Sequence, residues 1–260
     1  MRLENDVPVT EAHGLASEKD REYWSKFDTI LENSPHSEEH LLALWPVYVR
    51  RISMVRFLSH YELFKKIQNL PGDILDLGVS RGVSFFTFHK MLELFNPTDT
   101  SRKVIGVDSF EGLQDFSSSD GIQQSVVGKS QGGWSAKGVE SEIMQMLDLH
   151  NSDGVLTKTR GMIYKTRIQD LGTRLAQDRP GMRIALLHLD MDLYEPTLEA
   201  LRMFWDLVLP GGLVVFDEFA LPPWEGETKA WEDFAAERQL SYVIEKFPGT
   251  LNPNGFLIKR

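Results

Sequence analysis

Short apolar runs of strand length recur along the chain from residue 71 onward, and stretches with the apolar spacing of a helix separate most of them. The predicted strands are 73–79, 103–110, 157–165, 183–190, 211–219, 241–247 and 255–260. Strands that alternate with helices imply a parallel sheet covered on both faces. The last two runs have no helix between them, so one should lie antiparallel beside the other. The pattern predicts an α/β fold with a doubly wound, mostly parallel, seven-stranded sheet and an antiparallel C-terminal strand.

The N-terminal part follows a different pattern. Residues 1–35 are polar and weakly periodic, which predicts a partly helical arm, and 37–70 has helical spacing interrupted at Pro46. We therefore expect an N-terminal arm and helical extension over 1–70 and a second domain over 71–260. Apolar side chains of 37–70 would pack on the core or on another subunit, and we expect a homo-oligomer.

Residues 111–137 form the longest predicted loop, and they are rich in Ser, Gly and Gln. Loops of this length are usually functional or disordered. Trp134 lies in this loop and Trp224 in a later one. Either tryptophan could cover a site or simply pack on the surface, and the sequence does not decide between these interpretations.

Composition narrows the class of protein. The chain has 260 residues, of which 42% are hydrophobic and 25% charged, as in a soluble protein with a sizeable core. It has no cysteine, which excludes disulfides, thiolate metal sites and cysteine nucleophiles. The net charge of −10, without a basic cluster, argues against a nucleic-acid partner. The first residues lack the apolar stretch of a secretory leader, and no apolar run approaches about 18 residues, so we expect a cytoplasmic protein without a membrane partner.

Acidic side chains lie at the carboxyl ends of two predicted strands. The fourth strand ends in Asp190 and Asp192, and the fifth ends in Asp217 and Glu218. Strand alternation would place Asp190 and Asp192 on the same side, and ligands of such sheets bind at the carboxyl ends of the strands. Several carboxylates at one rim are unfavourable without a cation, and Mg²⁺ prefers oxygen ligands. The alternative is that these acids are separate helix caps, with Asp192 preceding a helix that has Pro196 in its first turn.

The first two strands end in residues suited to a nucleotide. The first strand ends in the stretch that contains Asp76, Gly78 and Gly82. The glycine spacing is unlike the dinucleotide motif, and the alternative is an ordinary turn with convenient glycines. Asp108 lies at the end of the second strand. A carboxylate there can accept hydrogen bonds from both hydroxyls of a ribose, and the alternative is that it only caps the next turn. His188 lies two residues before Asp190; we interpret it as a packed, hydrogen-bonded core residue, with ligation as the alternative.

Four blocks of the sequence, taken together, resemble a known family. They read GDILDLGVSRG, VIGVDSFEGL, LLHLDMDLYEPTLEAL and PGGLVVFDEF, in that order, between about residues 70 and 220. They resemble the blocks of class I S-adenosylmethionine-dependent methyltransferases, which have a Rossmann-like fold. More closely, they are similar to the macrocin O-methyltransferase family, which methylates hydroxyls of deoxysugars. DSFEGL and the D-x-D-x-Y-E-x-T stretch are the more specific parts.

The resemblance implies a role for each matched residue. The implied cofactor-binding residues are Asp76, Gly78, Gly82, Asp108 and Ser109. The implied metal ligands are Asp190, Asp217 and Glu218, and the implied general base is Asp192. The family often has Asp where this chain has Glu218, which keeps a carboxylate but lengthens the side chain.

The sequence thus predicts a metal-dependent O-methyltransferase. S-adenosylmethionine would be its methyl donor, Mg²⁺ or another divalent cation would assist, and its partner would be a small hydroxylated acceptor. We expect that acceptor to be a sugar, either nucleotide-linked or attached to a natural product. The alternatives are a catechol-type methyltransferase, an NAD-dependent oxidoreductase on a similar sheet, and a non-catalytic scaffold; the paired acids at two strand ends argue against the last two.

Overall fold

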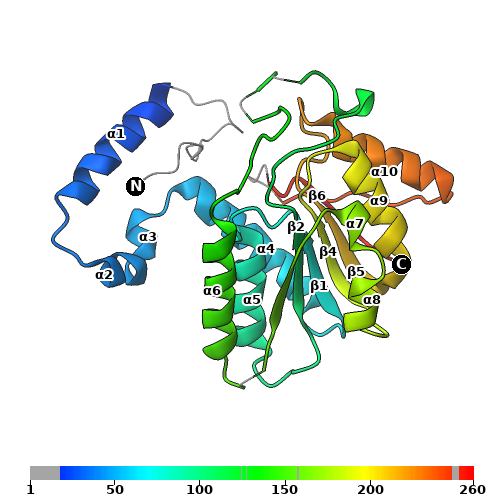
Figure 1. Cartoon of the computed structure of the whole chain (residues 1–260), viewed down its shortest axis with the longest axis horizontal. Coiled ribbons are helices and arrows are strands. Elements are labelled where there is room, and N and C mark those ends of the chain that lie inside the picture. Colours follow the sequence, from blue (N-terminus) through cyan, green and yellow to red (C-terminus); the bar gives the residue numbers. More distant parts are fainter. Residues whose placement is uncertain (1–17, 124, 127, 157, 248–251) are drawn as a thin grey trace.

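The computed structural model describes residues 18–123, 125–126, 128–156, 158–247 and 252–260. In these residues a single sheet lies between two layers of helices (Figure 1). Its strand order is β3-β2-β1-β4-β5-β6, and the strands are β1 (Asp73–Leu77), β2 (Val104–Asp108), β3 (Gly161–Lys165), β4 (Ile184–Leu189), β5 (Val208–Phe216) and β6 (Gly255–Ile258). β1 to β5 pair in parallel, and β6 pairs antiparallel with β5. The predicted α/β class, the parallel sheet and the antiparallel last strand are confirmed.

The helices fall where the apolar spacing predicted most of them. In chain order they are α1 (Glu18–Glu32), α2 (Glu38–Ala43), α3 (Trp45–Tyr48), α4 (Arg51–Ile67), α5 (Val83–Phe95), α6 (Glu140–Ser152), α7 (Ile168–Leu171), α8 (Arg174–Asp178), α9 (Tyr194–Phe204) and α10 (Glu225–Glu237), with short 3₁₀ turns η1 (Ser118–Asp120) and η2 (Trp205–Leu207). The stretch between β3 and β4 contains two short helices, α7 and α8, because Gly172 adopts a positive φ of 54° between them.

The core has two parts, one on each face of the sheet. α4, α5 and α6 cover one face, and apolar side chains such as Phe64 and Phe88 pack there against Ile74 and Leu186. α7 to α10 cover the other face, where Leu75 and the neighbouring strand residues meet the aromatic side chains of η2 and α10. Both faces of β1 and β4 are buried, which is why these strands read as continuous apolar runs.

The sheet has six strands in the described residues, so the prediction of seven was wrong. The segment 241–247, expected to be a strand, makes only one antiparallel bridge, between Glu245 and Phe256. Its alternating apolar side chains, Tyr242 and Ile244, pack against the core beneath α10. The alternation therefore reflects side-chain packing at the sheet edge and not a continuous ladder.

The N-terminal helices extend away from the sheet (Figure 1). Leu42 and Val47 are 76% and 73% exposed, whereas Leu63 and Phe64 in the second half of α4 are fully buried. Part of the predicted 37–70 extension thus belongs to the core, and the boundary at residue 70 stays a prediction. Residues 1–17 of the predicted arm lie outside the described residues.

Among the residues that the structure describes, no helix combines the length and the apolar character needed to cross a membrane.

Candidate active site

The predicted site residues lie at the carboxyl ends of β1, β2, β4 and β5. β1 pairs with β2 on one side and with β4 on the other, so the chain order reverses direction between β1 and β4. Ligands of doubly wound sheets bind in the crevice at this reversal. The structure therefore places the predicted cofactor residues and the predicted metal residues on the same rim.

The turn after β1 is built around two glycines with positive φ. Gly78 has a φ of 98°, and a Cβ at this position would overlap the carbonyl group of Asp190. Gly82 has a φ of 86° and is the residue before the first turn of α5, where a Cβ would meet the ring of Phe86. Only glycine fits both positions, so the turn runs directly against the end of β4.

Asp76 lies beneath this turn and is fully buried. Its Oδ2 accepts a hydrogen bond from Ser84 Oγ at 2.9 Å, and its Oδ1 lies 2.6 Å from His188 Nδ1. Both oxygens therefore have partners within the protein. Its predicted place in the cofactor site stays a prediction, and in this arrangement Asp76 would act by holding the turn.

Asp108 ends β2 and joins two neighbouring turns. One oxygen accepts a hydrogen bond from Phe110 N and the other from Ser80 N, each at 2.6 Å. Burial raises the pKa of Asp108, and these two N–H donors counteract the rise. Asp108 thus caps its own turn, as the simpler interpretation expected, and also reaches the β1–α5 turn. Ser109 Oγ accepts a hydrogen bond from Glu111 N at 3.2 Å.

Carboxylates crowd the ends of β4 and β5. We call Asp190, Asp192, Asp217, Glu218 and Glu227 the acid cluster; Glu227 comes from the first turn of α10, and its Oε2 accepts a hydrogen bond from Glu218 N at 2.7 Å. Burial, and then Coulombic repulsion within the cluster, raises the pKa of Asp192, Glu218 and Glu227 well above the usual range. The cluster is therefore short of positive charge.

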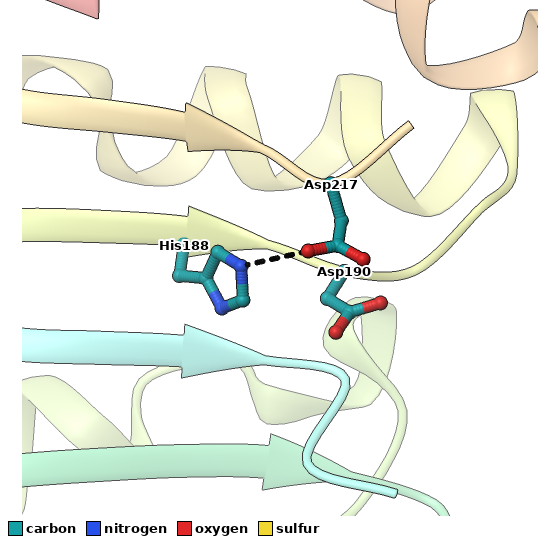
Figure 2. A group of neighbouring side chains, drawn as sticks. All are labelled: His188, Asp190 and Asp217. Atoms are coloured by element: carbon teal, nitrogen blue, oxygen red, sulfur yellow. Dashed lines mark hydrogen bonds and ion pairs between the residues drawn. The ribbon is translucent and has the colours of Figure 1, made fainter. Parts of the chain in front are cut away.

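Asp190 and Asp217 lie side by side with His188, and one possible ligand atom from each falls within 4.8 Å of the others (Figure 2). Arg56 of α4 donates to Asp190 Oδ2 at 2.8 Å and to Asp217 Oδ2 at 2.9 Å. Burial followed by repulsion from Asp217 raises the pKa of Asp190 to about 7. Burial would also raise the pKa of Asp217, but Arg56 and His188 outweigh it and hold that pKa well below its usual range.

His188 is the packed, hydrogen-bonded core residue that the sequence suggested. It is fully buried on β4, with Nδ1 facing Asp76 and Nε2 lying 3.4 Å from Asp217 Oδ1 (Figure 2). Burial alone would lower its pKa, but the hydrogen bonds with Asp217 and Asp76 raise the pKa to about 10. His188 thus connects the support of the glycine turn with the acid cluster.

Asn252 reaches the same place from the C-terminal segment. Its Nδ2 donates to Asp217 Oδ2 and to Glu218 Oε1, each at 2.7 Å. The other oxygen of Glu218 and Oε1 of Glu227 are buried without a hydrogen-bond partner among the described residues. Buried, unpartnered carboxylate oxygens are costly in a protein and fit the donor set of a hard divalent cation.

Asp192 does not continue the strand. β4 ends at Leu189, and Asp192 has a φ of 62°, so the argument from strand alternation does not extend to it. The alternative interpretation, in which Asp192 caps the next helix, does not hold either. The residue before α9 is Leu193, without a side-chain cap, and the amide of Tyr194 donates instead to Asp120 Oδ1 at 2.6 Å.

The long loop predicted over 111–137 is anchored beside Asp192. Within its described part, Leu113 packs with Leu193 and Trp224, and Trp134 packs against this small cluster. Lys129 is buried and donates to the carbonyl of Pro223 and to Glu225. Both tryptophans therefore pack in this apolar cluster, as the simpler of the two interpretations expected, and their covering a site stays a prediction.

Three contributors were missed by sequence reasoning: Arg56, Glu227 and Asn252. Arg56 lies in an apolar helical stretch 134 residues from Asp190, and Glu227 lies in a helix with several other acids. Asn252 follows the sequence Pro-Gly-Thr-Leu, which carries no chemical signal of its own. An arginine between apolar residues on a helix was the one available hint.

Sequence comparison places the chain among natural-product O-methyltransferases. The profile of the family described as Macrocin-O-methyltransferase (TylF) matches residues 55–250. A curated relative from Streptomyces olivaceus, 8-demethyl-8-(2,3-dimethoxy-alpha-L-rhamnosyl)-tetracenomycin-C 4'-O-methyltransferase, is 25% identical over 237 residues, covering 85% of this chain and 81% of the relative. Demethyldecarbamoylnovobiocin O-methyltransferase from Streptomyces niveus is 26% identical over 167 residues, covering 60% of this chain and 55% of the relative.

Solved structures agree with the sequence matches. A crystal structure of CalS11, described as a calicheamicin methyltransferase, has a TM-score of 0.85 at 25% identity and covers 99% of this chain and 97% of its own. An apo structure of CalS11, described as a TDP-rhamnose 3'-O-methyltransferase, has a TM-score of 0.76 at 25% identity, with coverages of 93% and 95%.

Proposed function

The chain belongs to the macrocin O-methyltransferase (TylF) family, and from this premise we propose that it transfers a methyl group from S-adenosylmethionine to a sugar hydroxyl with the help of a divalent cation. The observation that carries the proposal is the acid cluster beside the β1–α5 glycine turn. An O-methyltransferase needs an activated methyl donor next to a group that removes the proton of the acceptor. An NAD-dependent oxidoreductase would have no use for so many carboxylates.

The cofactor would bind across the ends of β1 and β2. S-adenosylmethionine, when bound, supplies an activated methyl group on a sulfonium centre. Gly78 and Gly82 would let its amino-acid part approach the backbone, and Asp108 with Ser109 would receive the ribose hydroxyls. Asp76 would keep the glycine turn in place through Ser84 and His188.

The acceptor hydroxyl would lie at the ends of β4 and β5. We assign Asp190, Asp217 and Glu218 as the residues that would hold Mg²⁺ or another divalent cation, and the unpartnered oxygen of Glu218 supports this choice. The cation, when bound, supplies a Lewis acid that stabilises a developing alkoxide. Asp192 would accept the hydroxyl proton, and added positive charge in the cluster would lower its pKa and keep it ionised.

The sugar could be nucleotide-linked or already attached to a natural product. The names of the relatives include both kinds of sugar, a TDP-rhamnose in one case and a rhamnosyl group on tetracenomycin in the other. A panel of nucleotide-linked deoxysugars, deoxysugar glycosides and simple catechols, analysed by mass spectrometry for a methyl gain, would identify the class. Methylation of catechols alone would reject a sugar acceptor and favour the catechol-type alternative.

Replacing Asp192 with Asn tests the base. We expect the methylation rate to fall by about 10² to 10⁴, because general base catalysis contributes roughly this much, while S-adenosylhomocysteine still binds. Asp206→Asn is a matched control, since Asp206 is an exposed partner of Arg238 away from the rim. Retained turnover in the Asp192 variant would remove it from this role.

Exhaustive chelation tests the cation separately. We expect chelation to abolish methyl transfer and added Mg²⁺ to restore it, with cofactor binding unchanged. Full activity after chelation would reject the cation and leave the methyl transfer itself standing.

A further inference from the structure

Arg56 contacts two carboxylates of the acid cluster, Asp190 and Asp217. Its guanidinium donates through Nη2 to Asp190 and through Nη1 to Asp217, so it bridges the two carboxylates in a fork. The same two residues contribute to the group of possible metal ligands (Figure 2). A guanidinium and a divalent cation would therefore compete for the same oxygens.

The hydrogen bonds of Asp217 show why both cations cannot be held together. Its Oδ2 already accepts from Arg56 and from Asn252, and its Oδ1 faces His188. A metal ion that binds Oδ2 would therefore lie beside the Arg56 guanidinium, and the two positive charges would repel each other. Arg56 must move away before Asp217 Oδ2 can become a ligand.

A path for such a movement exists. The Arg56 side chain is 25% exposed, whereas the side chain of its partner Asp217 is almost completely buried. Arginine carries a long, flexible stem, and its charged end is stable in water. Ile52 and Ser53, one turn earlier on the same face of α4, are only partly buried, so this side of the helix is not closed over.

We propose that Arg56 is an exchangeable counter-cation, which holds Asp190 and Asp217 together in the metal-free protein and withdraws when a divalent cation binds. The inference rests on the metal site of the proposed function. It assigns Arg56 a positioning role, since it keeps the carboxylates close before the cation arrives. It also predicts that the arginine lowers the apparent affinity for the cation, because part of the binding energy is spent on displacing it.

The size of the effect follows from the fork. Charge-assisted hydrogen bonds are about twice as strong as neutral ones, and the fork contains two of them. If the cation must overcome a net free energy of about 1.4 to 2.8 kcal/mol to displace Arg56, removing the fork should tighten cation binding by about 10- to 100-fold. A lysine at this position keeps the charge but cannot bridge two carboxylates in the same way, so it should give an intermediate value.

The experiment titrates the full chain with Mn²⁺ and measures the free ion by electron paramagnetic resonance. We expect Arg56→Gln to bind Mn²⁺ most tightly, Arg56→Lys to lie between Arg56→Gln and the unchanged protein, and Lys66→Gln to match the unchanged protein. Lys66 is an exposed cation of the same helix that lies over the ring of Phe256 and serves as the charge-removal control. Thermal unfolding should show a lower Tm for metal-free Arg56→Gln and a larger rise on adding Mn²⁺.

Four results would overturn the inference. Equal affinity of Arg56→Lys and the unchanged protein would mean that only long-range charge matters, and weaker binding by Arg56→Gln would mean that Arg56 stays and assists. Absence of Mn²⁺ binding in every protein would reject the metal site and the exchange together, whereas binding without any difference would reject the exchange alone. If Arg56→Gln does not fold, the comparison with Arg56→Lys decides.

Discussion

His60 and His188 form a natural pair for testing what a buried hydrogen bond contributes to stability. Both rings are fully buried and lie edge to face, with centroids 5.6 Å apart. His188 bridges Asp76 and Asp217, whereas neither ring nitrogen of His60 has a hydrogen-bond partner among the described residues. Replacing each by Met keeps an apolar side chain of adequate length in the same pocket. The two substitutions should therefore have very different costs.

The magnitude follows from what each substitution leaves behind. His188→Met would leave Asp76 fully buried with Ser84 as its remaining side-chain partner, and breaking a buried ion pair in this way costs about 3–5 kcal/mol. His60→Met removes two buried nitrogens that pay a desolvation cost without a hydrogen bond. The free energy of unfolding should then change by less than about 1 kcal/mol or rise slightly.

Urea denaturation at neutral pH, with a chelator present in every sample, measures both values. With an m-value of about 3 kcal/mol/M, the midpoint for His188→Met should fall by about 1–1.7 M, and that for His60→Met should stay within about 0.3 M. The chelator is needed because a bound cation would add its own stabilisation. Equal costs for the two substitutions would refute the assignment of His188 as the link between Asp76 and the acid cluster.

Further predictions concern the glycine turn, the long loop and the N-terminal helices. Gly78→Ala should weaken S-adenosylhomocysteine binding in calorimetry by at least about 10-fold, because its Cβ would overlap the Asp190 carbonyl; unchanged affinity would contradict this. Asp120→Asn should lower kcat/KM for the sugar by roughly 10-fold without affecting cofactor affinity, because a neutral side chain accepts a weaker hydrogen bond from Tyr194 N. An equal loss of cofactor affinity would argue for general misfolding. Leu42→Glu should shift the expected homo-oligomer to a smaller mass in light scattering, and an unchanged mass would exclude α2 from the interface.

Much of the fold could be predicted because its signals are local. Apolar runs and turn residues located the strands, and parallel strand ends meet at one rim whatever the details of packing. This is why Asp190 and Asp217 could be brought together from sequence alone. The strand expected over 241–247 failed because alternation reports burial of one face and does not reveal whether a neighbouring backbone is there to pair with.

The charge balance of the site could not be predicted for a different reason. Arg56 and Asn252 meet Asp217 only through tertiary packing, across 161 and 35 residues respectively. Periodicity describes a helix face but does not say which distant carboxylate that face will meet. Sequence reasoning therefore found most of the acids, and missed the groups that neutralise or orient them.

The position of Arg56 on α4 has a practical consequence for shortened versions of the chain. A fragment beginning at residue 71 would retain every strand and every acid of the cluster, and would look complete by strand pattern. It would lack the only guanidinium found bridging the two carboxylates in the described residues, and it would expose the apolar surface that Leu63 and Phe64 cover. The smallest autonomous catalytic unit should thus begin before α4, not at the first strand.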